Sequence, residues 1–131
     1  MRRTSIRIVG ACALTAALAL SATACAGSGD KKAACDKLQT TIPDVVKKTM
    51  AQVNDPNGMA QTYAEGANTL RQEGKDSGDG DVENAANHAA SALEALGQQV
   101  RSAASSGSTT PQIPDTSGLI SAGKELKSVC G

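Results

Sequence analysis

A chain of 131 residues has room for one small domain, and with no Trp, no Phe and a single Tyr it must build any core from aliphatic side chains and alanine. Its 13 basic and 13 acidic residues balance, but three of the arginines lie in the first seven positions and no acidic residue precedes Asp30. The rest of the chain therefore carries 10 basic and 13 acidic residues, a net charge of −3. A mildly acidic domain without a basic face or aromatic stacking platforms is poorly suited to bind nucleic acid, so we expect no nucleic-acid partner.

The first 24 residues have the order of a secretory signal peptide. Three arginines come first, an apolar run over residues 8–20 follows, and small residues then precede Cys25. The apolar run has 13 residues, which is too short to cross a hydrocarbon core that needs about 20. The pattern therefore predicts a signal peptide over residues 1–24 and not a transmembrane anchor.

Two kinds of cleavage site fit the sequence ATAC at residues 22–25. Ala22 and Ala24 satisfy an ordinary A-x-A site, which would release a freely secreted protein. The same four residues resemble the bacterial lipobox, in which small residues precede a cysteine that is diacylated and becomes the first residue. The lipobox usually has Leu where this chain has Ala22. A second match ends at Cys12, but no apolar segment precedes it, so we expect Cys12 to be removed with the signal.

The number of cysteines favours lipid attachment at Cys25. Exported proteins meet an oxidising environment, in which cysteines usually pair. With Cys25 lipidated, Cys35 and Cys130 remain as an even pair, whereas an unmodified Cys25 would leave one cysteine over. Residues 25–33 would then serve as a flexible tether between the anchor and a folded domain, because most of them are small or polar.

The leader is similar to those of small lipoproteins from high-GC Gram-positive (actinobacterial) bacteria, through its arginine-led start and the lipobox-like ATAC at residues 22–25. The resemblance covers only the targeting segment. It implies a protein held by lipid on the extracytoplasmic face of the cell membrane, and it implies nothing about the activity of the remaining chain.

Residues 34–131 are predicted to form a domain of helices. In the first helix, apolar residues recur every three or four positions, as on one face of a helix. We expect Pro43 to kink this helix, or to divide it into a short helix and a longer one. The apolar face comprises Cys35, Leu38, Ile42, Val45 or Val46, Met50 and Val53.

A second helix is predicted to begin with Asp55 as its N-cap and Pro56 as its first residue, and to end near Gly74. A third helix gives the clearest signal, because its apolar residues alternate in steps of four and three, the spacing of packed antiparallel helices. This seam comprises Val82, Ala86, Ala89, Leu93, Leu96, Val100 and Ala103. A linker rich in Ser, Thr and Pro, residues 105–115, leads to a fourth, shorter helix with Cys130 at its end. The residues expected to face inward there are Leu119, Ile120, Gly123, Leu126 and Val129.

These elements predict an all-α fold, a small antiparallel up-and-down bundle of four helices or of three. Four alternating helices place Cys35 and Cys130 at the same end of the bundle, whereas an odd number would separate them. We therefore predict a Cys35–Cys130 disulfide. Because a core without large aromatic side chains is small, a bridge that closes nearly the whole domain would contribute strongly to its stability.

Residues able to carry catalysis or hold a metal are few. His88 is the single histidine and is expected near the surface, and Met50 and Met59 fall on apolar faces where methionine usually fills space. The sequence DSGDGD at residues 76–81 does not match a calcium loop, because glycines stand where ligands are needed. No G-x-S-x-G motif is present. We expect no enzyme activity, no cofactor and no metal.

Two functions remain for the domain. One is a non-catalytic module, tethered by lipid, that contacts another protein or the cell envelope. The other is a small-molecule carrier that uses the bundle interior, for which we expect little room because alanines allow the helices to pack closely. A dry cavity of a few hundred cubic ångströms would favour the carrier. The Ser/Thr run at residues 105–110 could carry sugars, although we expect a solvated loop.

Overall fold

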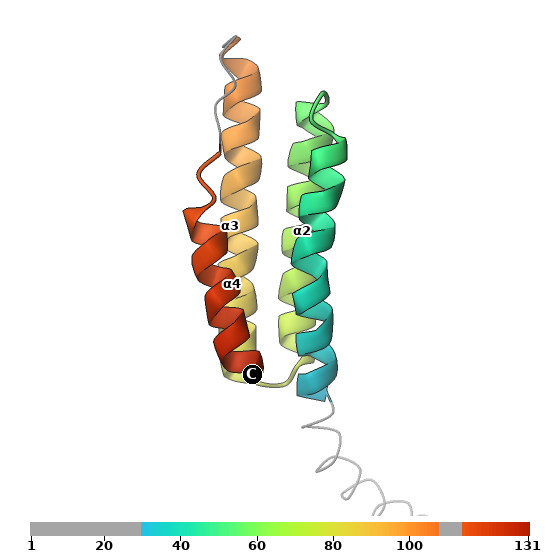
Figure 1. The fold of residues 1–131 in the computed structure, drawn as a ribbon, viewed down its shortest axis with the longest axis vertical. Coiled ribbons are helices and arrows are strands. Elements are labelled where there is room, and N and C mark those ends of the chain that lie inside the picture. The colour runs from blue at the N-terminus through green and yellow to red at the C-terminus, as the bar shows by residue number, and fades with distance from the viewer. Residues whose placement is uncertain (1–29, 108–113) are drawn as a thin grey trace, which may run out of the picture.

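The computed structural model describes residues 30–107 and 114–131 as four helices, and this part of the chain contains no strand. An N-terminal helix over residues 30–51 is followed by α2 (Pro56–Asp76), α3 (Gly80–Ser105) and α4 (Ser117–Cys130). The helices run alternately up and down, and the C-terminus returns to the end where the N-terminal helix begins (Figure 1). The predicted all-α bundle of four helices is confirmed.

The N-terminal helix is longer than expected. It begins at residue 30, four positions before the predicted start at Ala34, and continues without a break through Pro43. The division of the chain into two helices at Pro43 therefore does not occur. Pro43 is exposed to solvent, and so is the residue one turn earlier, whose carbonyl group lacks an N–H donor from Pro43 and can bond water instead. The earlier start brings Lys31 into the fold, where its Nζ donates a hydrogen bond to Asp79.

The predicted N-cap and first residue of α2 are both confirmed. Asp55 is the N-cap, and its Oδ1 accepts a hydrogen bond of 3.0 Å from the backbone N–H of Gly58. Pro56 occupies the first helical position, where its missing N–H would have had no partner within the helix. These two residues set the chain reversal that follows the N-terminal helix.

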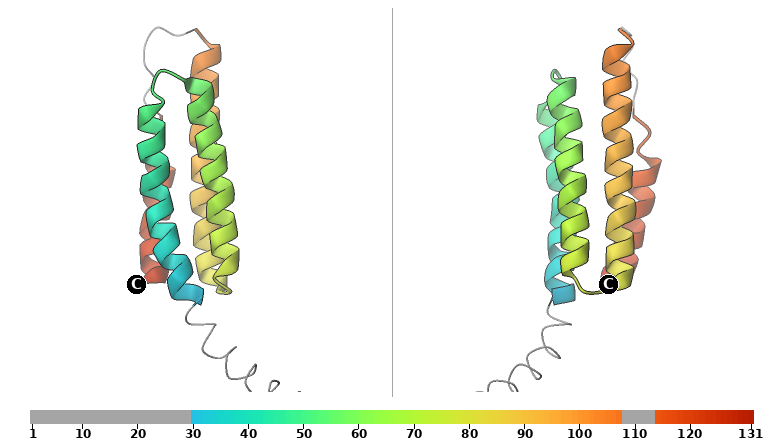
Figure 2. Two further views of the ribbon diagram at one scale, coloured as in Figure 1. Left: turned by 90° about the vertical axis from the view of Figure 1, so that its right-hand side faces the viewer. Right: turned by 180° about the vertical axis from the view of Figure 1, so that it is seen from behind.

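The helix α3 carries the largest part of the core, since it packs against α2 on one side and α4 on another (Figure 2). Six of the seven predicted seam residues are buried, and Ala103 is half-buried. The buried stripe is wider than the prediction because α3 faces two neighbours. Its additional members are Ala85, Ala90 and Gly97.

Small residues let the helices approach one another closely. A methyl group on Gly66 of α2 would lie only 2.5 Å from Cγ2 of Val45 in the N-terminal helix. A methyl group on Gly97 of α3 would lie 3.3 Å from the carbonyl oxygen of Ala60 in α2. The helices are therefore closely packed around a small core, as expected for a domain built from alanine, valine and leucine.

Three large apolar residues predicted to face inward are exposed instead. Met50, Val53 and Ile120 have 72%, 68% and 57% of their surface exposed. In the N-terminal helix the inward position next to the turn is taken by Thr49, whose hydroxyl donates to the carbonyl of Val46. Met50 lies at the far end of the bundle, which α4 does not reach because it lies beside only the first part of α3 (Figure 1). Val53 lies in the turn at residues 52–54, beyond the end of the helix, and Ile120 lies on the face of α4 that points away from the core.

Candidate functional site

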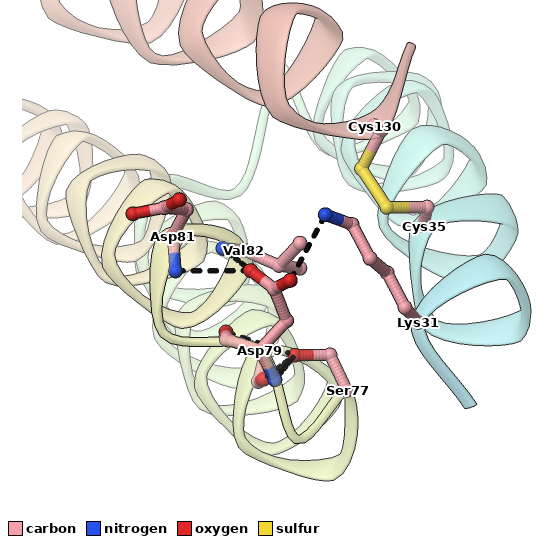
Figure 3. A network of polar contacts seen from close by, with 8 residues as sticks. Lys31, Cys35, Ser77, Asp79, Asp81, Val82 and Cys130 are labelled. Atoms are coloured by element: carbon pink, nitrogen blue, oxygen red, sulfur yellow. Dashed lines mark hydrogen bonds and ion pairs between the residues drawn. A yellow bond between two sulfur atoms is a disulfide. The ribbon is translucent and has the colours of Figure 1, made fainter. Parts of the chain in front are cut away.

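The predicted disulfide joins the two ends of the domain. Cys35 lies in the second turn of the N-terminal helix and Cys130 is the last residue of α4, 95 positions later. Their Cα atoms are 5.6 Å apart, a usual separation for bonded cysteines. Cys35 is only 4% exposed. The bond therefore closes the bundle at one end and is confirmed in the structure (Figure 3).

A second contact, between Lys31 and Asp79, closes the same end. The ammonium of Lys31 lies 2.9 Å from Oδ2 of Asp79 in the turn between α2 and α3. The other carboxylate oxygen of Asp79 accepts from the backbone N–H groups of Asp81 and Val82, at 3.0 and 3.1 Å, and so caps α3. The Lys31 hydrogen bond and these backbone donors hold the pKa of Asp79 below its ordinary value. The DSGDGD segment is thus a helix-capping turn.

Ser77 organises this turn from inside. Its side chain is buried, and its Oγ accepts a hydrogen bond from the backbone N–H of Asp79 and donates one to the carbonyl of Gly74. The sequence-based predictions did not include this serine, although serine hydroxyls in turns often accept a hydrogen bond from the backbone two residues later. Both oxygens of the Asp79 carboxylate already have donors, so the turn offers little for a calcium ion.

His88 lies on the surface, as predicted, and contacts α4. Its Nδ1 is 2.8 Å from Oε2 of Glu125, and 64% of its side chain is exposed. Within residues 30–107 and 114–131, no three His, Cys, Asp or Glu side chains gather closely enough to hold a metal ion. The arrangement here is a surface pair between two helices.

Within the described part of the chain, hollows on the surface between helices include the following two. One, of about 200 Å³, lies between the N-terminal helix and α2; the other, of about 350 Å³, lies between α2 and α3. Both are lined in part by charged residues, and the lining of the second also includes small residues. The first is lined by Thr41, Asp44, Val45, Lys48, Thr62, Glu65, Gly66 and Thr69, and the second by Ala60, Ala64, Glu94, Gly97, Gln98 and Arg101. Neither is an enclosed apolar cavity.

Some of the polar side chains at these hollows bond to neighbouring helices. Arg71 makes a two-pronged contact with Glu94, with nitrogen–oxygen distances of 2.6 and 2.8 Å, and this contact lowers the pKa of Glu94. The hydroxyl of Thr41 donates to Glu73, and that of Thr62 donates to Gln52. These bonds link neighbouring helices, so they serve the fold.

The remaining predictions about sites lie outside the described residues. Cys12, the lipid-attachment residue Cys25 and the signal peptide precede residue 30, and most of the Ser/Thr run at residues 105–110 falls in the undescribed linker. Among the described helices, none combines the length and the apolar character needed to cross a membrane.

Comparison with known proteins adds no assignment. No family model matches the chain, and neither the curated proteins nor the solved structures include a match.

Proposed function

We propose that the protein is a lipoprotein attached through Cys25 to the extracytoplasmic face of the cell membrane, with its helical domain acting as a non-catalytic interaction module. The observation that carries the proposal is the bond between Cys35 and Cys130. Because these two cysteines are bonded to each other, neither is available to pair with Cys25. In an exported protein this favours a modification of Cys25 other than a disulfide, and its lipobox-like sequence favours lipidation.

The start of the N-terminal helix fixes how far the domain stands from such an anchor. Five positions separate Cys25 from Asp30, where the helix begins, and five residues span at most about 18 Å. The disulfide end of the bundle would therefore lie close to the membrane. The turn at residues 52–54 lies at the other end of a helix of 22 residues, about 33 Å further out. This far end would face the envelope or other proteins.

An interaction module agrees better with the surface hollows than a small-molecule carrier does. A carrier site is normally concave, mostly apolar and able to bury most of its ligand. The two hollows between helices are open and have charged walls, and Glu94 in the wall of the second is bonded to Arg71. The exposed side chains Met50 and Val53 lie at the far end of the bundle.

Metabolic labelling with an alkyne analogue of palmitate tests the anchor. The wild-type chain and a Cys12→Ala variant should both incorporate the label and stay with the membrane fraction. A Cys25→Ala variant should lose the label and appear in the medium. Equal labelling of the Cys25→Ala and Cys12→Ala variants would contradict lipid attachment at Cys25, and an unlabelled wild type recovered from the medium would support free secretion.

Photo-crosslinking on intact cells tests the module. A photoreactive amino acid at Val53, at the far end, should give adducts with an envelope protein, identified by mass spectrometry. The matched control is the same amino acid at Lys75, an exposed position near the disulfide end, which should give fewer protein adducts. The same faint adducts from both positions would count against a partner at the far end.

A further inference from the structure

The helix α4 rests on a small part of the bundle. Only Ala122 and Leu126 of its 14 residues are buried, and Leu119 and Val129 are half-buried. It packs on α3, and no backbone approach between α4 and α2 occurs in the described residues. By contrast, α3 buries nine of its residues. Of the three helices α2, α3 and α4, the helix α4 therefore buries the fewest residues.

As an isolated segment, α4 is a weak helix. Helices of fewer than about 12 to 15 residues are marginal in water even with favourable sequences, and α4 contains two glycines, Gly118 and Gly123. Its N-cap, Thr116, makes no side-chain capping hydrogen bond. The segment therefore depends on its contacts with the bundle to remain helical.

The polar contacts between α4 and α3 lie near the surface. Glu125 meets His88, and the backbone N–H of Asp115, just before α4, donates to Oε1 of Gln99 at 2.8 Å. Both contacts are exposed, and exposed contacts of this kind contribute little. Besides the few apolar side chains of α4 that reach the core, the remaining connection is covalent: Cys130, at the end of α4, is bonded to Cys35.

We propose that α4 is a strap held closed by the Cys35–Cys130 disulfide, and that reduction of this bond releases α4 while the other three helices stay packed. A dithiol reductant supplies two electrons and two protons; the sulfur–sulfur bond breaks, Cys35 and Cys130 become thiols, and the reductant becomes a disulfide. Release uncovers the side of α3 that carries His88 and Ala92. This proposal is independent of lipid attachment at Cys25.

The other three helices hold one another without α4. Arg71 of α2 bonds Glu94 of α3, and a methyl group on Gly66 of α2 would meet both Val45 and Leu93. The Lys31–Asp79 pair links the start of the N-terminal helix to the turn between α2 and α3. None of these contacts involves a residue of α4. A three-helix core therefore remains when α4 departs.

Hydrogen exchange measured by mass spectrometry on the complete mature chain tests the strap. The comparison is between the oxidised protein, the same protein with dithiothreitol, and a Cys35→Ser/Cys130→Ser double variant. In both disulfide-free forms the amides of α4 should exchange at least about tenfold faster than in the oxidised protein, while those in the middle of α2 and α3 change far less. Dithiothreitol should not alter the double variant, which controls for effects of the reductant itself.

The protection of α2 and α3 also reports whether the disulfide-free protein is folded. If α4 keeps the protection that it has in the oxidised protein, the disulfide is not what holds it. If all four helices lose protection to the same extent, the disulfide supports the whole fold and α4 is not a separate strap. Reoxidation should restore protection in α4, and failure to do so would contradict a reversible strap.

Discussion

Gly74 in the last turns of α2 lies directly against Ala86 of α3, with no room for another methyl group between them. A Cβ atom built on Gly74 would lie 2.5 Å from Cβ of Ala86 and 3.3 Å from the backbone of Glu83. Real Cβ atoms do not approach so closely, so any side chain at this position must push the two helices apart. Small residues at this crossing are what allow α2 and α3 to meet near the capping turn.

Replacing Gly74 by alanine should therefore destabilise the domain, although alanine is the better helix former. We expect Gly74→Ala to lower the free energy of unfolding by about 1 to 3 kcal/mol, the usual cost of overpacking a close contact. The matched control is Gly123→Ala in α4, where a Cβ meets nothing within 4 Å. That change should raise the free energy of unfolding by up to about 1 kcal/mol. Urea titrations followed by circular dichroism measure the free energy of unfolding of both variants. An equal increase in the two variants would contradict the close approach of Gly74 and Ala86.

Breaking the disulfide should lower the melting temperature by well over ten degrees. Cys35 and Cys130 are 95 residues apart, and a closed loop of this size is worth about 4 to 5 kcal/mol in the chain-entropy model. For a domain of this length each kcal/mol shifts the melting temperature by about 4 to 8 °C. Thermal unfolding with and without a strong reductant gives the shift. The reduced protein should also show less helix before melting begins, and a melting curve that reductant leaves unchanged would contradict a stabilising bridge.

Much of the fold could be predicted because it depends on short-range sequence patterns and on the numbers of helices and cysteines. The regular spacing along α3 identified six residues that are buried, and Asp55 with Pro56 identified the start of α2. The pairing of Cys35 with Cys130 followed from the number of helices and the number of cysteines, and the structure contains that bond. Each of these sequence features is compatible with only a few structures.

The inward positions near the far end could not be predicted because they depend on where the N-terminal helix ends and on how far the distant helix α4 reaches. The spacing in the N-terminal helix fits Met50 and Val53 as well as it fits Leu38, yet only Leu38 has neighbours on every side. Likewise, Lys31 bonds a residue 48 positions away, and Ser77 bonds the backbone of its own turn. Neither contact can be predicted from the spacing of apolar residues. For the site, cysteine parity was informative, but no pattern indicates what the domain contacts.

This difference between the two ends of the N-terminal helix has a measurable consequence. Leu38→Ala should lower the free energy of unfolding by about 2 to 5 kcal/mol, because Leu38 is completely buried and its removal leaves a cavity. Met50→Ala should change it by less than about 0.5 kcal/mol, because Met50 is 72% exposed. Urea unfolding of the two variants provides the comparison. A loss at Met50 as large as that at Leu38 would mean that the far end is covered in solution.

The capping turn should make the stability of the domain depend on pH in the acidic range. The hydrogen bond from Lys31 and the backbone N–H groups of α3 lower the pKa of Asp79 in the folded state. The ionised carboxylate therefore stabilises the fold at pH values above the ordinary aspartate pKa of about 4, and this contribution is lost as the pH falls through the lower folded-state pKa. Asp79→Asn keeps a capping side chain but cannot be ionised, so it should melt below the wild type at neutral pH and nearly with it at about pH 2.

Asp81→Asn is the matched control, because it removes a charge from the same end of α3 without touching Lys31. The carboxylates of Glu94 and Asp115 also have lowered pKa values, but both are present in all three proteins and cancel in the comparison. The melting temperatures of the wild type and the two variants are recorded from neutral pH to about pH 2. The difference between Asp79→Asn and the wild type should shrink as the pH falls, and the difference between Asp81→Asn and the wild type should change less. A gap between the wild type and Asp79→Asn that stays constant over this range would show that the Asp79 carboxylate does not stabilise the fold through its charge.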